Sequence, residues 1–261
     1  MVSEPYTPDN LLDRRSAPET LQVHYEQEQR RERELLDRRL ERRGGEVLSV
    51  GCGWHPGRHL FPRGAWRMTG ADLNSDMIDH LLATGDIDAG VHGRAGELPL
   101  ASGSFDVVLY RLVLHHIAFQ GPLRPCFEEA ARLLRPGGAL VAIEPGLWHP
   151  VGAGLELANR AGLGVWTHGT PDDVPLSPRE LVGEARTAGL APELHAVTYG
   201  WRRLPSRAQR LLHRLDALGS RPRLARLGHT LMLIGRRYST TGSPKPGRSN
   251  GGPSAVQPSR S

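Results

Sequence analysis

An apolar run that breaks into a glycine turn, with a carboxylate at a set distance after it, is the feature that most constrains this chain. The run ends at Val50, the turn holds Gly51 and Gly53, and Asp72 closes the next apolar run 19 residues after Gly53. About 20 residues separate the glycine turn from the ribose-binding acid of a nucleotide-binding βαβ unit. Glycine lets the backbone come close to a ligand, and an acid at the tip of the next strand accepts ribose hydroxyls. The spacing therefore predicts a parallel sheet that binds an adenosine-containing ligand.

Short apolar segments alternate with amphipathic ones along the chain. This alternation predicts a doubly wound α/β fold, with a parallel sheet and helices on both faces. We expect strands near residues 46–51, 67–72, 90–94, 105–110, 139–144, 193–199 and 229–235. We expect helices near residues 18–43, 75–84, 123–135, 151–161 and 178–188, and one helix or a helix pair over 205–226.

The length and the cysteine count limit the class of protein. With 261 residues, of which 38% are hydrophobic, the chain is expected to form one large domain with appendages. No apolar run comes near the ~20 residues of a membrane span, and the first residues do not read as a signal peptide, so we expect a cytoplasmic protein. The two cysteines, Cys52 and Cys126, exclude a disulfide framework and a thiolate zinc site, and no metal site is expected.

The net charge of +5 does not indicate a nucleic-acid partner. Residues 239–261 hold Lys245, Arg248 and Arg260 and no acid, so this tail carries three of the five charges. Aromatic residues make up 5% of the chain and do not alternate with basic ones in the manner that stacks bases. Nucleic acid is therefore not the expected substrate.

Three further motifs follow the glycine turn in order. Residues 93–109 read GRAGELPLASGSFDVVL, residues 114–117 read LHHI, and residues 134–140 read LRPGGAL. Together with the glycine turn, these motifs resemble the class I S-adenosylmethionine-dependent methyltransferases, and LHHI resembles the small-molecule branch of that family. The resemblance covers about residues 46–145, the helix that begins after Ser177, and the closing strands.

This resemblance implies a Rossmann-like sheet in the order 3-2-1-4-5-7-6, with strand 7 antiparallel. The cofactor S-adenosylmethionine would lie across the carboxyl ends of strands 1, 2 and 4, where the strand order reverses. The chain would divide into an N-terminal arm with a charged helix (1–45), a methyltransferase domain (46–238) and a disordered basic tail (239–261). Within the domain, residues 146–176 and 200–226 are expected to be insertions that shape the acceptor site.

Carried over by position, the resemblance implies that the cofactor contacts Gly51, Cys52, Gly53, Asp72, Leu73, Ala95, Gly96, Tyr110 and Arg111. The backbone of the glycine turn would meet the methionine part. Asp72 would hold the ribose hydroxyls, and Leu73 would pack against adenine. The backbone N–H of Ala95 would reach the adenine edge, and Tyr110 and Arg111 would line the methionine end.

The sequence departs from the family pattern in three places. Ser49 stands where an acid usually precedes the glycine turn, and Trp54-His55-Pro56 lengthens the turn. The acid that commonly takes the adenine amino group falls on Arg94, which has no acceptor lone pair, so Glu97 is the substitute acceptor. Each ligand hydrogen bond that goes unreplaced would cost ~1–2 kcal/mol of affinity.

Methyl transfer from a sulfonium is a direct displacement that mainly needs alignment of the acceptor. A base is needed only when the acceptor must lose a proton. His115 and His116 are the candidate bases, with structural packing as the alternative; Glu144 and His149 are further candidates, with a strand-end cap as the alternative for Glu144. An apolar acceptor pocket or ordinary core packing are the two hypotheses for Trp148, Trp166 and Trp201.

The resemblance implies a methyltransferase that acts on a small-molecule or lipid-like acceptor. The alternative is a non-catalytic partner or regulatory protein on the same fold, which Ser49 and Arg94 motivate. A nicotinamide-dependent oxidoreductase also fits the glycine turn, but the common Tyr-x-x-x-Lys arrangement is impossible because Lys245 is the only lysine. The basic stretch Arg202–Arg226 is either a solvated helix face or a contact for a membrane surface.

Overall fold

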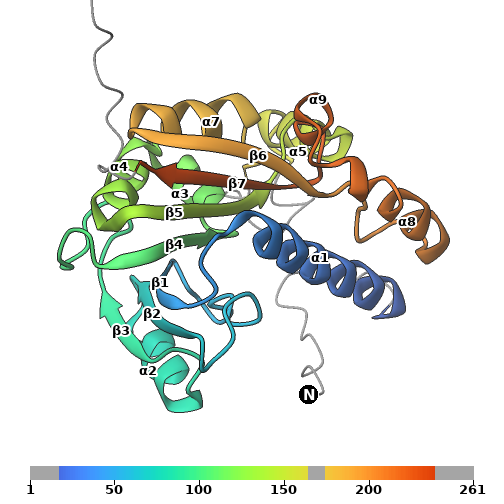
Figure 1. Ribbon diagram of the computed structural model, residues 1–261. Helices are drawn as coiled ribbons and strands as arrows, with labels where there is room; N and C mark the ends of the chain where they lie inside the picture. The colour runs from blue at the N-terminus through green and yellow to red at the C-terminus, as the bar shows by residue number, and fades with distance from the viewer. Residues whose placement is uncertain (1–17, 164–173, 239–261) are drawn as a thin grey trace, which may run out of the picture.

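The structure of the protein is a computed structural model that describes residues 18–163 and 174–238 (Figure 1). The first residues of the predicted arm, Trp166 with part of the predicted insertion 146–176, and the predicted disordered tail 239–261 lie outside the described residues.

A seven-stranded sheet forms the centre of the described part, in the order β3-β2-β1-β4-β5-β7-β6. Every neighbouring pair is parallel except those of β7, which is antiparallel to β5 and to β6. The predicted fold class and strand order are thereby confirmed. The strands are β1 (Gly45–Val50), β2 (Trp66–Asp72), β3 (Ala89–His92), β4 (Phe105–Arg111), β5 (Leu134–Pro145), β6 (Leu190–Thr198) and β7 (Thr230–Arg237).

The helices surround the sheet (Figure 1). They are α1 (Pro18–Arg39), α2 (Ser75–Thr84), α3 (Leu114–Gln120), α4 (Arg124–Leu133), α5 (Pro150–Arg160), α7 (Pro178–Thr187), α8 (Ser206–His213), the 3₁₀ turn η2 (Asp216–Leu218) and α9 (Pro222–Ala225). The predicted helices agree with α2, α4, α5 and α7 to within two residues at each end.

Two predicted helices differ from the structure. The first helix ends at Arg39 rather than Arg43, because the chain turns there and Arg43 donates from Nη2 to the carbonyl of Asp37 in the last turn, at 2.6 Å. The stretch 205–226 forms three short pieces rather than one helix or a pair. Pro222, which lacks the backbone N–H that would continue a helix, begins the last of them.

The connection from β1 to β2, residues 51–65, contains only turns, although parallel crossovers usually carry a helix. Pro56 and Pro62 interrupt it. Phe61, 1% exposed, fills the space against the sheet, and its ring meets the ring of Trp66 edge to face at 5.1 Å. Arg58 donates from Nε to the carbonyl of Asp86 at 2.8 Å. Buried apolar contacts, Arg58 and Arg63, which donates to the carbonyl of Gly85, therefore hold this crossover in place of a helix.

Two apolar clusters pack on the two faces of the sheet. Leu35 and Leu36 of α1 share one cluster with the buried residues of α2 and of the crossover. Residues of α3, α4 and α7 belong to the other. Because α1 contributes to the first cluster, it packs against that face of the sheet. Its polar residues extend toward the edge at which the parallel strands have their carboxyl ends.

Candidate functional site

The glycine turn lies at the carboxyl end of β1, beside the end of β2. Gly51 and Gly53 have φ of +62° and +47°, a left-handed conformation that favours glycine. A Cβ at Gly51 would lie 2.2 Å from a methyl of Val113, so only glycine fits there. The backbone N–H groups of Gly51 and Cys52 both donate to the carbonyl of Ala71, at 2.7 and 3.2 Å. These two backbone hydrogen bonds fix the turn to β2.

Asp72 is tied to this turn. Its Oδ2 accepts the N–H of Gly53 and its Oδ1 accepts the N–H of Asn74, both at 2.9 Å. A carboxylate has about four lone-pair sites, so acceptor capacity remains for two ribose hydroxyls. Burial, with Asp72 close by, raises the pKa of the Cys52 thiol to about 12, so the thiol is protonated at pH 7.

The predicted adenine side is built from β2, β3 and the loop after β3. Leu73 is 58% exposed and presents an apolar surface next to Asp72. His92, at the end of β3, fixes this segment by donating from Nε2 to the carbonyl of Leu73 at 2.8 Å. Gly96 lies against α4, where a Cβ would approach Pro125 to 2.9 Å. An exposed leucine side chain next to a backbone that these contacts hold in place is suited to pack against a flat aromatic base such as adenine.

The departures from the family pattern are visible at this place. Ser49 is buried in β1, 3% exposed, so no charged group stands there. Arg94 is exposed and forms a one-residue bridge with Glu97, whose N–H donates to the Arg94 carbonyl at 3.0 Å. Both side chains lie at the surface within one turn of the loop. Glu97 therefore stands close to the position that Arg94 occupies.

The side chains of Tyr110 and Arg111 are held by protein groups. Tyr110 is 1% exposed, and its hydroxyl donates to the carbonyls of Cys126 at 3.0 Å and Ala95 at 3.3 Å. Arg111 points to the other face of the sheet and pairs with Glu32 of α1, with Nη2 to Oε1 at 3.2 Å. Contacts between the cofactor and these two residues therefore stay a prediction. They would involve only the backbone atoms of Tyr110 and Arg111.

His115 and its neighbour His116 begin α3, with ring centroids 4.0 Å apart. Glu144, fully buried in β5, lies 2.7 Å from Nδ1 of His115 and accepts the N–H groups of Val113 at 3.0 Å and Leu114 at 2.8 Å. A carboxylate at a helix N-terminus satisfies unpaired donors and the helix dipole. Glu144 therefore caps α3 and orients His115.

Leu112 is strained at the end of β4. Its φ is +56°, and it is the one non-glycine residue with positive φ among the described residues. Its N–H donates to the carbonyl of Ile143 at 2.8 Å, which holds the strained backbone in place. Such outliers gather at functional sites. Sequence reasoning missed this one because nothing marks a leucine for that conformation.

A buried polar stripe on α1 was also missed. His24, Glu28 and Glu32 recur every four residues and are 1%, 6% and 1% exposed. The carboxyl group of Glu28 accepts a hydrogen bond from the hydroxyl of Thr230, at the start of β7. Burial alone would raise the pKa of Glu32, but Arg111 and His59 together lower it. The spacing of four, in line with Leu21 and Leu35 to Leu36, is the signal that could have revealed the stripe.

Four histidines gather around the start of this stripe. The ring centroid of His24 lies 6.3 Å from that of His213 and 5.9 Å from that of His229, which is 5.2 Å from His149. Burial, then the nearby Arg202 and His213, lowers the pKa of His24 from 6.5 to about 3. Burial also lowers the pKa of His149 and His229. His24, His149 and His229 are therefore neutral at pH 7.

Glu28→Gln is expected to raise the free energy of unfolding at pH 8 by on the order of 2 kcal/mol. Burial, then the charge of Glu32, raises the pKa of Glu28 from 4.5 to about 7, so the folded protein binds its proton more tightly than the unfolded chain. Stability is therefore lost as the pH rises from 4.5 through 7. Urea unfolding should give a much smaller difference at pH 5. The exposed acid Glu26, changed to Gln, is the control, and equal effects of Glu28→Gln at both pH values would contradict the assignment.

The other candidate residues, His149, Trp148 and Trp201, contact other groups of the protein. His149 accepts the N–H of Val151 at Nδ1, at 3.2 Å, and so caps α5. Trp148 and Trp201 are half-buried, and each is covered by an arginine, with centroid distances of 5.1 and 5.9 Å. Neither tryptophan lies in a closed apolar core.

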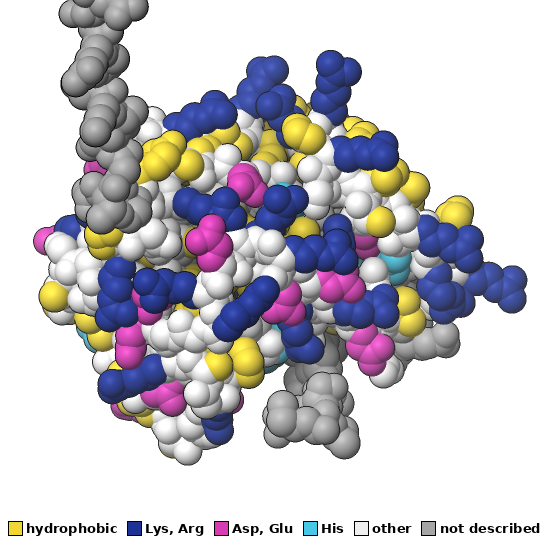
Figure 2. All heavy atoms as spheres, in the orientation of Figure 1, with side chains coloured by type: hydrophobic (Ala, Val, Ile, Leu, Met, Phe, Trp, Pro, Cys, Tyr) yellow, Lys and Arg dark blue, Asp and Glu magenta, His cyan; other side chains and the backbone are white. Residues whose placement is uncertain are grey.

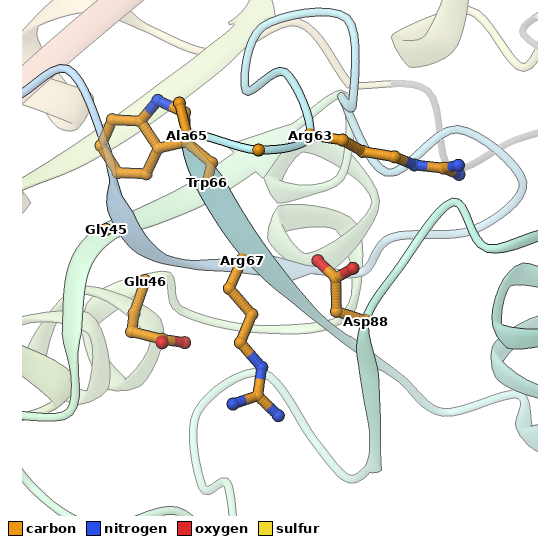
Figure 3. A pocket seen from close by; sticks show the side chains of 8 residues that line it. Gly45, Glu46, Arg63, Ala65, Trp66, Arg67 and Asp88 are labelled. Atoms are coloured by element: carbon orange, nitrogen blue, oxygen red, sulfur yellow. The ribbon is translucent and has the colours of Figure 1, made fainter.

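A hollow of about 510 Å³ lies at the opposite edge of the sheet (Figure 3). It is lined by Gly45, Glu46, Arg63, Gly64, Ala65, Trp66, Arg67 and Asp88. Figure 3 shows Glu46 and Arg67 projecting from neighbouring strands at the start of β1 and β2. Open parallel sheets bind ligands at the carboxyl ends of their strands, so this hollow is separate from the site around Asp72.

Among the described residues, no group of three or more histidine, cysteine or acidic side chains is arranged to hold a metal ion. No helix in residues 18–163 or 174–238 is long and apolar enough to cross a membrane.

Residues 48–142 match the model of a methyltransferase domain family. The chain is 34% identical over 117 residues to a Mycolicibacterium smegmatis protein named "Probable S-adenosylmethionine-dependent methyltransferase", over 44% of each chain. It is 35% identical over 102 residues to a malonyl-[acyl-carrier protein] O-methyltransferase of Hahella chejuensis, over 37% of this chain and 35% of that one. The matched stretch spans less than half of the length of these curated relatives.

The fold is similar to the crystal structure of a Thermotoga maritima protein described as a "SAM-dependent methyltransferase, possible histamine N-methyltransferase". The TM-score is 0.58 and the identity 16%, over 84% of this chain and 91% of that one. At this identity, the likeness is one of fold alone.

Proposed function

This chain carries a class I S-adenosylmethionine-dependent methyltransferase domain, and from this premise we propose that it transfers the cofactor's methyl group to a small-molecule or lipid-like acceptor. The observation that carries the proposal is the pairing of Asp72 with the left-handed glycine turn at the carboxyl ends of β1 and β2. The relatives' acceptors belong to those proteins, and the acceptor class proposed here follows from the LHHI motif.

The residues of the turn fit the cofactor. The space at Gly51 excludes a side chain, and the exposed Leu73 adjoins the carboxylate of Asp72. We assign the methionine part to the backbone of Gly51 to Gly53, the ribose to Asp72 and the adenine to Leu73 and the backbone at Ala95 and Gly96. When bound, S-adenosylmethionine supplies a methyl group on a positively charged sulfur.

His115 is the proposed base for an acceptor that must lose a proton, with Glu144 as the residue that positions it. The carboxylate of Glu144, 2.7 Å from Nδ1, orients the ring of His115. His116, half-buried and with its ring tilted by 39° against that of His115, is the second candidate. For a neutral amine acceptor no base is required, and alignment alone would suffice.

His115→Asn is expected to lower kcat for a hydroxyl acceptor by roughly 10²- to 10⁴-fold, because that is the usual contribution of a positioned base. Glu144→Gln should lower it less and shift the pH profile, since the amide can still accept N–H groups of α3. The affinity for S-adenosylhomocysteine should not change in either variant. An unchanged kcat with a hydroxyl acceptor would remove His115 from the mechanism.

The activity itself is tested in two steps. Thermal unfolding with millimolar S-adenosylhomocysteine should give an upward shift of the midpoint, and no shift would contradict cofactor binding. Incubation with methyl-labelled S-adenosylmethionine and a small-molecule and lipid extract should then transfer label to an extractable product. Cofactor binding without transfer to any acceptor would favour the alternative, a non-catalytic partner or regulatory protein. Ser49 and Arg94 in place of the usual acids are the observations behind that alternative.

A further inference from the structure

The segment 200–228 presents only positive charge at the surface. It contains eight arginines and one acid, Asp216. Asp216 is 1% exposed, and its carboxylate accepts the N–H of Tyr199 at 2.9 Å and lies 3.1 Å from Nδ1 of His213. The exposed arginines are Arg203, Arg207, Arg210, Arg214, Arg221, Arg223 and Arg226. Figure 2 shows basic side chains gathered at the end of the molecule that holds α8.

Leucines are exposed among these arginines. Leu211, Leu215 and Leu227 are 62%, 46% and 45% exposed. Arg214, which separates α8 from η2, keeps right-handed helical dihedrals, as does Leu215. Leu211 and Leu215 therefore project from the same side, one turn apart. We call the exposed residues of this stretch, Arg207, Arg210, Leu211, Arg214 and Leu215, the arginine–leucine face.

A groove of about 610 Å³ lies beside this face, between α1 and α8. It is lined by Val23, Glu26, Gln27, Arg30, Arg210, His213 and Arg214. Its lining thus includes three arginines and one acid. The imidazole of His213 also belongs to the buried histidine cluster under α1. The face is therefore continuous with a basic groove that reaches the polar interior at the carboxyl edge of the sheet.

We propose that the arginine–leucine face docks on the surface of a bilayer rich in anionic lipid. The leucines enter the boundary between headgroups and acyl chains, and the arginines contact lipid phosphates, as amphipathic surface segments do. The groove between α1 and α8 receives an anionic headgroup. Exposed leucines contribute nothing to phosphate contacts, and Trp201 is the only aromatic residue in the segment. This combination favours a lipid surface over nucleic acid. The proposal deepens the lipid-like acceptor class of the proposed function.

Sedimentation with vesicles tests the docking. The full chain should bind vesicles of equal parts phosphatidylglycerol and phosphatidylcholine at low salt, bind phosphatidylcholine alone about tenfold less, and be released by high salt. Leu211→Ser with Leu215→Ser should weaken binding by about tenfold, and Arg207→Gln with Arg210→Gln and Arg214→Gln by at least as much. The matched control is Leu82→Ser with Arg67→Gln, on α2 and β2, which should bind as the parent does. Circular dichroism checks that every variant is folded.

Several outcomes would overturn the proposal. The first is equal binding to neutral and anionic vesicles. The second is full binding by the leucine variant, which would leave only attraction to a polyanion. The third is displacement from vesicles by a nucleic-acid duplex at equal phosphate concentration. Vesicle binding without a thermal shift from S-adenosylhomocysteine would support the docking and refute the methyltransferase proposal. A thermal shift without vesicle binding would refute the docking alone.

Discussion

Asp72→Ala should weaken the binding of S-adenosylhomocysteine by about 100-fold, as measured by calorimetry. The carboxylate is the acceptor assigned to both ribose hydroxyls, and hydrogen bonds to a charged group contribute ~1.5–3 kcal/mol each, where ~1.4 kcal/mol is tenfold. Ser49 and the basic Arg94 leave it as the main carboxylate at the glycine turn. Residues 51–57, which form the turn, contain no acid.

Asp72 has a second role that the experiment must separate. Its Oδ2 accepts the N–H of Gly53, so alanine also loosens the turn. Asp72→Asn keeps one acceptor oxygen and should weaken binding by only about tenfold. Asp76→Ala, an exposed acid on α2 four residues away, should bind as the parent does. Binding by Asp72→Ala within a factor of two of the parent would contradict the assignment of the ribose.

His24→Leu should remove much of the acid sensitivity of the fold. The pKa of His24 falls from 6.5 unfolded to about 3 folded, so below pH 6.5 the unfolded chain binds a proton that the folded protein does not. The contribution of His24 to the free energy of unfolding is therefore complete above pH 6.5 and is lost as the pH falls toward 3. The loss is about 1.4 kcal/mol for each pH unit, on the order of 3 kcal/mol at pH 4.5.

Urea unfolding at pH 7.5 and pH 4.5 measures this difference. The parent should lose stability over the interval, and His24→Leu should lose markedly less, whatever its absolute stability. The ionisation of Glu28 changes the stability in the opposite direction over the same pH interval. The comparison therefore uses the difference between the parent and His24→Leu in how much stability each loses. His80→Leu, an exposed histidine on α2, should retain the parental slope. Equal slopes for His24→Leu and the parent would mean that the cluster does not carry the acid response.

The sheet could be predicted from the sequence because its signals are local. Each strand is a short apolar run bounded by turn residues, and every predicted strand overlaps one in the structure. The order of strands followed from the family resemblance, which the motifs around Gly51, Asp72 and Gly137 carried. The glycine turn and Asp72 are also brought together as the spacing indicated.

The features that were missed depend on tertiary contacts. Helix α3 has only seven residues, and its N-terminus is capped by Glu144 from β5, thirty residues away in the sequence. The charged α1 reads as a solvated helix until Thr230 and Arg111 are placed against it. The roles assigned to the site residues, the domain limits and the cytoplasmic location stay predictions.

The bond between Glu28 and Thr230 has a consequence for how the chain is made. The two residues are 202 positions apart, and Thr230 begins β7, the last strand along the described part of the chain. Until β7 is synthesised, the acidic stripe of α1 has no complete set of partners, and its burial would cost free energy. Helix α1, the first described element to be synthesised, therefore docks among the last. Docking of α1 is therefore expected to wait for the synthesis of β7 and to be slowed by the long loop that must be closed.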